Sequence, residues 1–309
     1  MINPFGQNKA ERFSRDIAPS NEEQAAEWQK ANRSWWESNP MRYDFVDAPI
    51  SAPEFSSEFY REVDRRFLRT VRVAFPWTKI PFDNFIDYGK LASQEVLEVG
   101  VGCGTHAQLL AGKARAYTGI DITDYAVRST TRRLETAGLK GRIIKMDAEN
   151  MTFPDASFDF VWSWGVIHHS SNTKAILGQI HRVLKPAGKF VFMVYHESPW
   201  NTFFRGWLYY GLLKGGLFKG SNAHELLQQN TDGALARYYT ASRLRAELAG
   251  LFELNRIDYL GNKLQLLPLK YGPLKEAASK VIPDRLGRWL TNRPFVAYML
   301  VATCRKRSS

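Results

Sequence analysis

Apolar residues recur at every fourth position near residue 60 and predict a helix there. We expect this helix from about Pro53 to Val73, with one apolar face for packing. That face consists of Phe55, Phe59, Val63, Phe67 and Val71. A second helix is predicted over residues 20–39, because a Ser or Asn cap precedes acidic residues and Pro40 stops the pattern.

The pattern changes at about Gln94, where short apolar runs begin to alternate with helical periods. The runs are VLEVG, AYTGID, RIIKMD, FDFVWSWG and KFVFMVYH. Further on, SRLRAELAGLFELNRIDYL predicts a helix and then a strand, and FVAYMLVATC predicts a last strand. Such alternation favours βαβ units, and hence a doubly wound, mostly parallel α/β sheet with helices on both faces.

Two segments interrupt this alternation, at residues 198–239 and at about 261–293. We therefore predict four parts in the chain. These are an N-terminal helical cap (1–90), an α/β core (91–197), an inserted helical lid (198–239), and a last part (240–309) that completes the sheet around the second insertion.

Composition agrees with a folded protein and narrows its chemistry. With 309 residues, 44% of them hydrophobic, the chain can bury a sizeable core. No apolar run reaches the roughly 18 residues of a membrane-spanning helix, and MINPFGQNKAERFSRD lacks the apolar stretch of a signal peptide, so we expect a cytoplasmic protein. Cys103 and Cys304 match neither a metal-ligand spacing nor a disulfide framework, and no metal site is predicted.

The formal net charge of +11 is concentrated in the last third of the chain. Residues 1–197 hold 25 Lys and Arg against 24 Asp and Glu, whereas residues 198–309 hold 17 against 7. A basic region of this kind is compatible with an anionic partner, namely nucleic acid, an acidic membrane surface or a negatively charged substrate. A merely solubilising surface is the alternative, and composition leaves it open.

Three glycines in VLEVGVGCGTHAQLL follow a predicted strand and open a helix, so bare backbone can approach a ligand at a helix N-terminus. The dinucleotide fingerprint G-x-G-x-x-G would need its third glycine at position 105, where this chain has Thr105. A phosphate-binding P-loop is also excluded, because no Gly-Lys-Ser or Gly-Lys-Thr follows. If the turn is a cofactor site, it therefore fits neither a dinucleotide nor a triphosphate, and the turn alone leaves a purely structural role open.

Acidic residues end the next two predicted strands. Asp121 in AYTGID stands at the distance from the glycine turn at which a carboxylate meets ribose hydroxyls. Asp147 ends the third strand, where it can accept a hydrogen bond from an exocyclic amine. A helix cap or turn residue is the alternative interpretation of Asp147.

Taken together, VLEVGVGCGTHAQLL, TGIDIT, KMDAENMTFPDASFDFVWSWGVIHH and QIHRVLKPAGKFVFMVY resemble the successive motifs of class I S-adenosylmethionine-dependent methyltransferases. The resemblance covers about residues 94–197 well, and it points to the small-molecule group that includes quinone-biosynthesis enzymes. It implies a Rossmann-like, seven-stranded, mostly parallel sheet whose last strand inserts antiparallel beside its neighbour. It also implies S-adenosylmethionine as the cofactor.

Carried over residue by residue, the resemblance implies a set of cofactor-binding positions. In chain order these are Glu98, Gly100, Gly102, Gly104, Asp121, Ile122, Asp147, Ala148 and Trp164. The first four would surround the amino-acid part of the cofactor. Asp121 would bind the ribose hydroxyls, Asp147 with Ala148 would face the adenine, and Trp164 would line the methyl side.

In such enzymes a nucleophile attacks the sulfonium methyl in line, so the protein mainly positions two ligands. A general base is useful when the acceptor is a hydroxyl or an acidic carbon. His169 and His168, just beyond the fourth strand, are the candidates for that base, and a structural role is the alternative. The chain lacks the Pro-Pro-aromatic motif of nucleic-acid amino-methylating enzymes and a suitably placed nucleophilic cysteine, which favours a small-molecule acceptor.

The acceptor site is expected beneath the first insertion, where SPWNTFFRGWLYYGLLKGGLFKGS is crowded with aromatic residues. One interpretation is an apolar pocket wall for an aromatic, isoprenoid, polyketide or lipid-like substrate; another is an amphipathic helix on an anionic membrane; a third is a packed cap. Tyr43, Trp207 and Tyr238 are the candidate substrate contacts.

The sequence thus predicts an S-adenosylmethionine-dependent methyltransferase acting on oxygen or carbon of a hydrophobic small molecule. Peripheral contact with an anionic membrane is compatible with this, and nucleic acid is not the expected partner. Two alternatives stay open. One is an RNA-directed methyltransferase, which only the basic last third favours; the other is a non-catalytic protein that keeps the cofactor fold.

Overall fold

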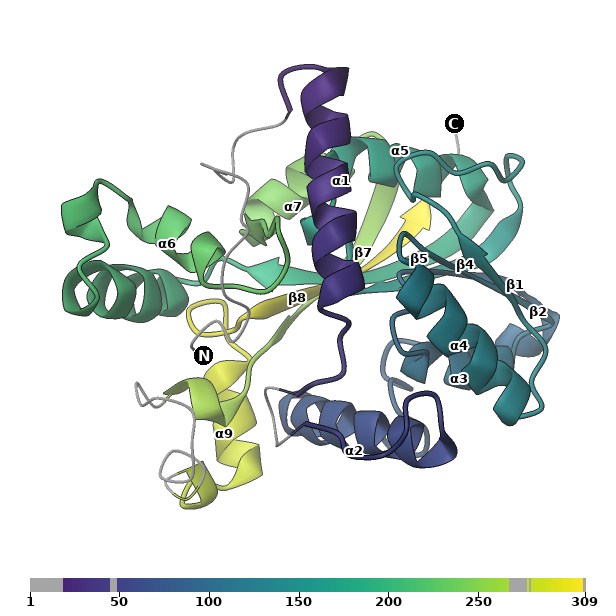
Figure 1. Ribbon diagram of the computed structural model, residues 1–309, viewed down its shortest axis with the longest axis horizontal. Coiled ribbons are helices and arrows are strands. Elements are labelled where there is room, and N and C mark those ends of the chain that lie inside the picture. Colours follow the sequence, from purple (N-terminus) through teal and green to yellow (C-terminus); the bar gives the residue numbers. More distant parts are fainter. Residues whose placement is uncertain (1–18, 45–48, 267–276, 278, 308–309) are drawn as a thin grey trace.

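A mostly parallel sheet forms the centre of the molecule (Figure 1). The computed structural model describes residues 19–44, 49–266, 277 and 279–307. The strands are β1 (Glu95–Val99), β2 (Ala116–Asp121), β3 (Arg142–Lys145), β4 (Phe158–Trp164), β5 (Leu184–His196), β6 (Tyr238–Tyr239), β7 (Phe252–Leu260) and β8 (Met299–Lys306). Two parts of the sequence predictions lie outside the described residues. They are the N-terminal segment that lacks a signal-peptide pattern, within residues 1–18, and residues 267–276 and 278 of the second insertion.

The strand order is β3-β2-β1-β4-β5-β8-β7, and β6 pairs with β5 beside this path. Strands β3, β2, β1, β4 and β5 are parallel, whereas β8 lies antiparallel between β5 and β7. The predicted α/β sheet with an inserted antiparallel strand is confirmed, and the short β6 adds an eighth strand that the sequence pattern did not indicate. Because the parallel strands share one direction, the carboxyl ends of β1, β2 and β4 meet at one edge of the sheet.

Helices cover both faces of the sheet (Figure 1). They are α5 (Thr173–Val183) and α7 (Ala241–Leu248) on one face, and α2 (Ser57–Ala74), α3 (Thr105–Ala111) and α4 (Asp124–Thr136) on the other. Leu97 and Val161 pack toward the first group, and Val96 and Phe160 toward the second, as the alternation of side chains along a strand requires. The short 3-10 helix η1 (Leu91–Ser93) precedes β1.

The two predicted N-terminal helices are present, with one boundary shifted. Helix α1 (Glu22–Ser38) begins after Asn21, whose side chain caps it. Helix α2 begins after Ser56, whose hydroxyl accepts a hydrogen bond from the N–H of Phe59 at 3.1 Å. The predicted start of α2 lay too early, because Phe55 stands outside the helix with a φ of 64°.

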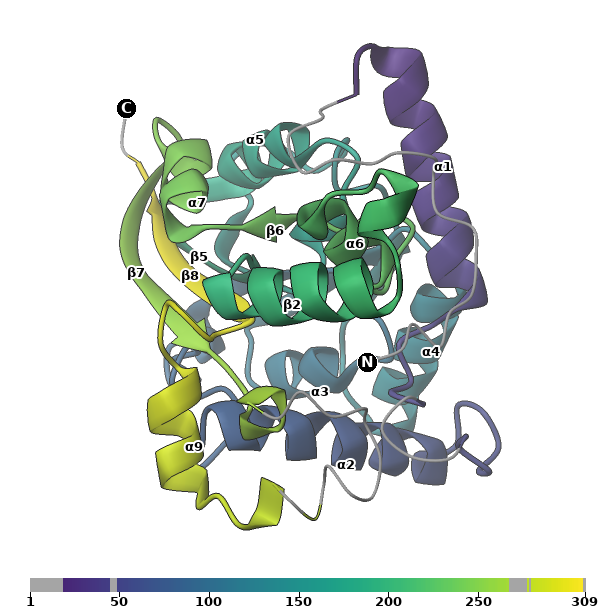
Figure 2. The same ribbon diagram turned by 90° about the vertical axis from the view of Figure 1, so that its left-hand side faces the viewer.

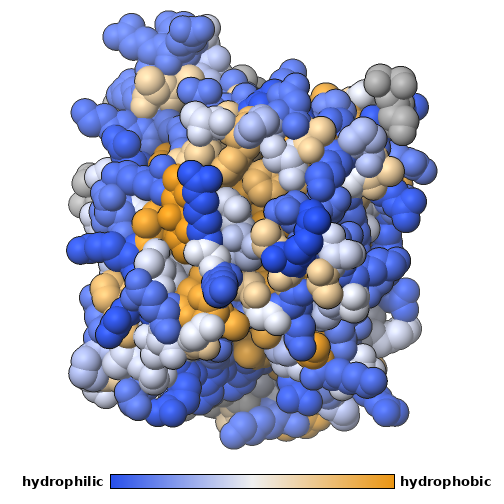
Figure 3. Space-filling model, turned by 90° about the vertical axis from the view of Figure 1, so that its right-hand side faces the viewer, coloured by the Kyte–Doolittle hydropathy of each residue, from blue (hydrophilic) through white to orange (hydrophobic). Residues whose placement is uncertain are grey.

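The first insertion contains the π-helix η3 (Asn201–Leu213), the 3-10 helix η4 (Leu217–Lys219) and α6 (Ala223–Gln229). The second contains η5 (Lys263–Leu266) and α9 (Asp284–Thr291). In Figure 2 the green helix η3 lies in the foreground, and α9 lies on the same side. The opposite side of the molecule shows hydrophilic residues around a central hydrophobic strip (Figure 3). Among the described helices, none is long and apolar enough to cross a membrane.

Candidate active site

The glycine turn after β1 presents bare backbone to a cavity. Gly100, Gly102 and Gly104 have positive φ values of 83°, 53° and 79°. A Cβ at Gly100 would lie 2.2 Å from Cγ2 of Val166, so only glycine permits this close approach. A Cβ at Gly102 would meet no atom within 4 Å, and Gly102 lines the cavity. The turn therefore leaves room for a ligand at Gly102.

A buried arginine holds the glycine turn in place through hydrogen bonds. The guanidinium of Arg133 donates hydrogen bonds to the carbonyl of Cys103 (3.1 Å) and to the carboxylate of Asp64 (2.5 Å). The same carboxylate accepts a hydrogen bond from the hydroxyl of Thr105 at 2.7 Å. Since Asp64 belongs to α2 and Arg133 to α4, this network ties two helices to the backbone of the turn.

Asp121 ends β2 directly beside this turn. Its carboxylate accepts hydrogen bonds from the N–H of Gly102 (3.2 Å) and from the N–H and hydroxyl of Thr123 (3.0 and 2.8 Å). Burial raises the pKa of Asp121, and the hydrogen bonds from Thr123 and Gly102 oppose that rise. Asp121 and Ile122 both line the cavity. The carboxylate is thus fixed at the turn with lone pairs left for hydroxyl donors.

Asp147 follows β3 and is held from above by α1. Its Oδ1 accepts hydrogen bonds from Nε2 of Gln29 and from the N–H of Glu149, each at 2.9 Å. Asp147, Ala148 and Gln29 all line the cavity. Helix α1 therefore forms part of the wall at the end where Asp147 lies.

The C-terminal end of α1 is anchored to α4. The carboxylate of Glu37 accepts hydrogen bonds from the N–H groups of Asp124 (2.7 Å) and Tyr125 (3.1 Å), in the first turn of α4. An acidic group is favourable there, because the free N–H groups and the helix dipole attract negative charge. Figure 1 shows α1 standing in front of the sheet.

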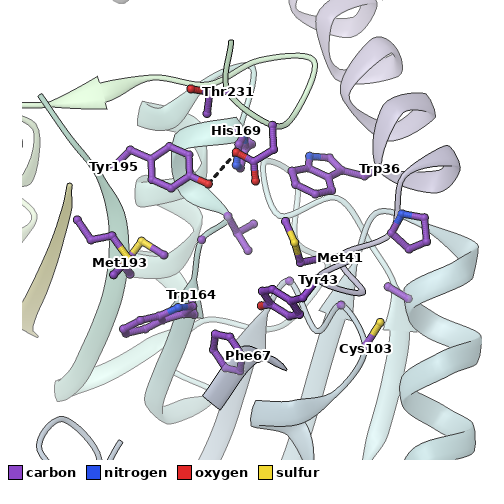
Figure 4. Close-up of a pocket in the computed structure, with 18 of the residues that line it drawn as sticks. Trp36, Met41, Tyr43, Phe67, Cys103, Trp164, His169, Met193, Tyr195 and Thr231 are labelled. Carbon is purple, nitrogen blue, oxygen red and sulfur yellow. Dashed lines mark hydrogen bonds between the residues drawn. The ribbon is translucent and has the colours of Figure 1, made fainter. Parts of the chain in front are cut away.

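One cavity of about 500 Å³ extends from the glycine turn to the inserted helices. In Figure 4, side chains of Trp36, Tyr43, Trp164, His169 and Tyr195 surround it. Of the predicted site residues, those that line it are Tyr43, Gly100, Gly102, Gly104, Asp121, Ile122, Asp147, Ala148, Trp164, His169 and Tyr238. Glu98, His168 and Trp207 do not line it.

Glu98 lies behind the glycine turn and is only 1% exposed. It accepts a hydrogen bond of 2.5 Å from the hydroxyl of Tyr117, and burial raises its pKa to about 8. A mainly protonated carboxyl away from the cavity offers no charge to a bound ligand. The structure therefore does not bring Glu98 to the site, in contrast to the expectation from its place before the glycines.

The two candidate bases occupy different positions in the 3-10 helix η2 (Ile167–His169). His169 faces the cavity, where its ring packs edge-on against Trp36 at 5.0 Å between centroids. Its Nδ1 lies 2.5 Å from the carbonyl of Leu235, so this nitrogen carries the proton and donates it. His168 is fully buried behind the wall, and burial together with His169 holds its pKa well below the usual range. A neutral imidazole without access to the cavity is unsuited to take a proton from a ligand.

His106, which follows the glycine turn, lines the cavity without facing water. Its ring lies among aromatic rings, 4.5 Å from that of Phe82 and 5.2 Å from that of Trp162 between centroids. Burial and the nearby Arg133 lower the pKa of His106 to about 3, so the imidazole is neutral. Neither of its ring nitrogens has a hydrogen-bond partner among the described residues.

The cavity wall also holds a polar pair that sequence reasoning missed. The hydroxyl of Tyr195 donates a hydrogen bond of 2.8 Å to the carboxylate of Asp232, and both residues line the cavity. The position of Tyr195 at the end of β5 was a usable signal, since strand ends at this edge carry the other site residues. Asp232 gave no such signal, because it lies in an irregular loop after α6.

Helix η3 closes the cavity with one side only. The side chains that line it from this helix and its cap are Trp200, Phe204, Arg205, Tyr209 and Tyr210. Trp207 points away from the cavity and is 42% exposed, with its ring stacked on that of Phe203. The structure therefore does not bring Trp207 to the cavity, in contrast to the expectation, because the residue stands on the outer side of the helix. Tyr238 does line the cavity, and its hydroxyl shares a short hydrogen bond with that of Thr231.

Comparison with known proteins adds to this geometry. Residues 97–192 match the family model described as a methyltransferase domain. A sterol 24-C-methyltransferase of Neurospora crassa is 37% identical over 99 residues, which are 31% of this chain and 26% of that protein. An S-adenosyl-L-methionine-dependent Diels-Alderase of Talaromyces variabilis is 30% identical over 141 residues, 44% of this chain and 45% of that protein. The chain thus spans less than half the length of these two relatives.

A solved structure supports the fold over most of the chain. Geranyl diphosphate C-methyltransferase from Streptomyces coelicolor, in complex with Mg²⁺, geranyl diphosphate and S-adenosyl-L-homocysteine, superimposes with a TM-score of 0.57. The match covers 94% of this chain and 100% of that one, at 13% sequence identity. At that identity the likeness shows a shared architecture, which extends into the regions flanking residues 97–192.

Proposed function

We propose that this chain, whose residues 97–192 match a methyltransferase domain, is a class I S-adenosylmethionine-dependent methyltransferase that transfers a methyl group to oxygen or carbon of a hydrophobic small molecule. One observation carries the proposal. The glycine turn, Asp121 and Asp147 share a single cavity with the aromatic wall of η3, so a donor and an acceptor can meet in it.

The donor would lie along the carboxyl edge of the sheet. We assign the bare backbone of Gly100, Gly102 and Gly104 to its amino-acid part, because Gly102 has open space before it. Asp121 and Ile122 would hold the ribose, with the fixed carboxylate accepting both hydroxyls. Asp147 and Ala148 would face the adenine.

The acceptor would lie between Trp164 and helix η3. S-adenosylmethionine supplies an electrophilic methyl on a sulfonium, which leaves as the neutral thioether when the acceptor's electron pair attacks. The chain's own contribution is to hold the two ligands in line and to keep water out. Aromatic residues from α1, β4 and η3 line this part, which suits an aromatic or isoprenoid-like molecule.

An acceptor that reacts through a hydroxyl or an acidic carbon also loses a proton. His169 and the pair formed by Tyr195 and Asp232 are the polar groups at the acceptor end of the cavity. We assign the pair to the polar end of the acceptor, where Asp232 can accept its proton or hydrogen bond. His169 remains the second candidate for this role, and His168 is excluded by its position behind the wall.

A second function is favoured by one observation. The relative from Talaromyces variabilis is named for cyclisation rather than methyl transfer, although it depends on S-adenosylmethionine. The same cavity could hold the cofactor and fold a reactive chain against the aromatic wall. In that case the cofactor would be bound and not consumed.

Two measurements separate these functions. Calorimetric titration with S-adenosylmethionine compares the unaltered chain with Asp121→Ala and with the control Asp124→Ala, whose exposed carboxylate pairs with Lys145 outside the cavity. We expect Asp121→Ala to weaken binding at least about tenfold, as the loss of a charge-assisted hydrogen bond does, and Asp124→Ala to leave it nearly unchanged. Equal affinities in all three proteins would refute the proposed donor site.

The second measurement follows the methyl group. Tritium from methyl-labelled S-adenosylmethionine should pass into the organic phase of a lipid extract incubated with the chain. Cofactor binding without label transfer, in extracts that support known small-molecule methyltransferases, would favour the non-transferring alternative. Label in the aqueous RNA fraction would instead identify nucleic acid as the acceptor.

A further inference from the structure

In the part of the chain that the structure describes, the large hydrophobic side chains that stand well exposed lie in the two insertions or directly beside them. The large hydrophobic side chains that are exposed in the described part of the chain are Phe203, Trp207, Leu212, Leu213, Phe218, Val281, Leu286, Trp289 and Phe295. All nine lie within residues 203–218 or 281–295, and the sheet and its covering helices contribute none. Since water-exposed patches of this kind mark interaction sites, the insertions form a candidate docking surface.

Helix η3 presents aromatic rings on both of its sides. Phe204 and Arg205 line the cavity, whereas Phe203 and Trp207 point outward with exposures of 51% and 42%. The two outward rings stack on each other, 5.5 Å apart between centroids. The helix is therefore apolar toward the solvent as well as toward the cavity.

Basic residues accompany the apolar ones along this segment. Beyond η3, Phe218 is 82% exposed, and the ammonium groups of Lys214 and Lys219 stand exposed on either side of it in sequence. Residues 200–220 contain three basic residues and no acidic one. The surface of the first insertion is thus both apolar and positively charged.

Helix α9 repeats this combination in the second insertion. Leu286 and Trp289 are 48% and 61% exposed, and the guanidinium of Arg293 lies over the ring of Trp289 at 5.1 Å. Residues 280–295 contain four basic residues and one acidic residue, Asp284, which pairs with Lys263. Residues 280–295 therefore carry an excess of positive charge that no acidic residue among them cancels.

The two insertions contact each other where η3 begins, close after the end of α9. The N–H of Trp200, which caps η3, donates a hydrogen bond of 3.0 Å to the carbonyl of Phe295, and the two rings are 6.5 Å apart. Figure 2 shows η3 and α9 on the same side of the molecule. We call the set Phe203, Trp207, Phe218, Leu286, Trp289 and Phe295 the aromatic face.

We propose that the aromatic face docks on an anionic lipid bilayer. Aromatic rings bind at the boundary between headgroups and acyl chains, and each Lys or Arg near an anionic surface adds electrostatic attraction. A second copy of this chain is disfavoured as the occupant, because it would bring like charges together. Nucleic acid is disfavoured as well: bases can stack on the Phe and Trp rings, but the exposed aliphatic side chains of Leu213, Val281 and Leu286 suit acyl chains instead.

Docking would place the bilayer directly against the helix that closes the cavity. Under the proposed function, a lipid-soluble acceptor would then pass η3 from the membrane to Trp164 without crossing bulk water. Lipid binding itself depends only on the aromatic face and its charge, so it can be tested without methyl transfer.

The test is flotation of the full chain with vesicles of phosphatidylcholine, with and without one third phosphatidylglycerol. We expect flotation with the anionic vesicles and little with the neutral ones. The double variant Phe203→Ser with Trp207→Ser should lose flotation about tenfold or more, while keeping its melting temperature and its S-adenosylmethionine affinity. Retained affinity shows that the loss concerns the face rather than the donor site.

Charge is tested with a matched pair of variants. The double variant Lys214→Glu with Lys219→Glu should lower flotation. The control, Lys113→Glu with Lys140→Glu, makes the same change in net charge at exposed positions just after α3 and α4, and it should leave flotation unchanged. Equal flotation of both pairs would overturn the proposal, as would no preference for anionic vesicles. A dimer in sedimentation that the Phe203→Ser, Trp207→Ser variant abolishes would assign the face to a second copy, and RNA retention abolished by the same variant would assign it to nucleic acid.

Discussion

Tyr195 and Asp232 join the end of β5 to the loop after α6 through a hydrogen bond of 2.8 Å at the cavity wall. Burial and the neighbouring Asp232 raise the pKa of Tyr195 well above its usual value, so the phenol stays protonated and donates. The carboxylate keeps further lone pairs for a ligand. The pair is therefore a fixed polar contact within a largely aromatic part of the cavity.

Replacing Tyr195 by Phe removes the donor that orients Asp232. We expect label transfer into organic extract to fall about tenfold or more, the effect of one hydrogen bond to a charged group, with S-adenosylmethionine affinity unchanged. The control is Tyr259→Phe in β7, which removes a phenol outside the cavity. Transfer equal to that of the unaltered chain would show that the pair does not contact the acceptor.

Two roles of Gly102, in backbone conformation and in ligand binding, can be tested separately. Gly102→Ala places a methyl group in space where no atom lies within 4 Å, at a φ of 53°, and we expect a loss of about 1–2 kcal/mol in stability from that backbone alone. Gly138→Ala, at a φ of 64° and also in open space, should cost a similar amount. Only Gly102→Ala should weaken S-adenosylmethionine binding, because Gly138 lies at the end of α4 outside the cavity. Thermal melts and calorimetric titrations check both parts, and equal affinity in the two variants would contradict the assignment of the turn.

Glu98 predicts a pH dependence of stability. Its pKa is raised by burial from an ordinary value of 4.5 to about 8, so folding takes up a proton between these values. The stabilisation is complete below about pH 4.5 and is lost as the pH rises to about 8, with a slope of at most about 1.4 kcal/mol per pH unit. Glu98→Gln should flatten this slope in urea unfolding followed between these pH values.

The control for that experiment is Glu95→Gln, the same change at a more exposed position of the same strand, where the carboxylate pairs with Arg115 at 2.8 Å. We expect its slope to match that of the unaltered chain. If Glu98→Gln keeps the full slope, the carboxyl of Glu98 is ionised in the folded chain.

The sequence predicted the features that depend on the local spacing of hydrophobic residues and on the positions of strand ends. The strands from β1 to β5 and the terminal positions of Asp121 and Asp147 follow from hydrophobic alternation, since strand ends share one edge of a parallel sheet. The sequence analysis placed Glu98 at the cofactor, but its side chain points to Tyr117 and away from the cavity. That direction depends on packing behind the sheet, which no local pattern records.

The acceptor end was harder to predict because its contacts are long-range. Tyr195 and Asp232 are brought together only when the insertion folds back on β5, and nothing in either segment specifies the other. Trp207 was assigned to the cavity by its aromatic neighbourhood. Composition indicated that this helix lines the pocket, but the direction of each ring depends on how η3 packs against α6.

Helix α1 also bears on how this protein can be divided. Its Gln29 and Trp36 belong to the cavity wall. Both lie about sixty residues or more before residue 97, where the match to the methyltransferase domain begins. A fragment cut to the sheet alone would retain the glycine turn and Asp121, yet the cavity would lose the wall that α1 forms beside Asp147. Shortened forms made for crystallography or expression should therefore begin before α1, because the boundary of a recognisable domain is not the boundary of its binding site.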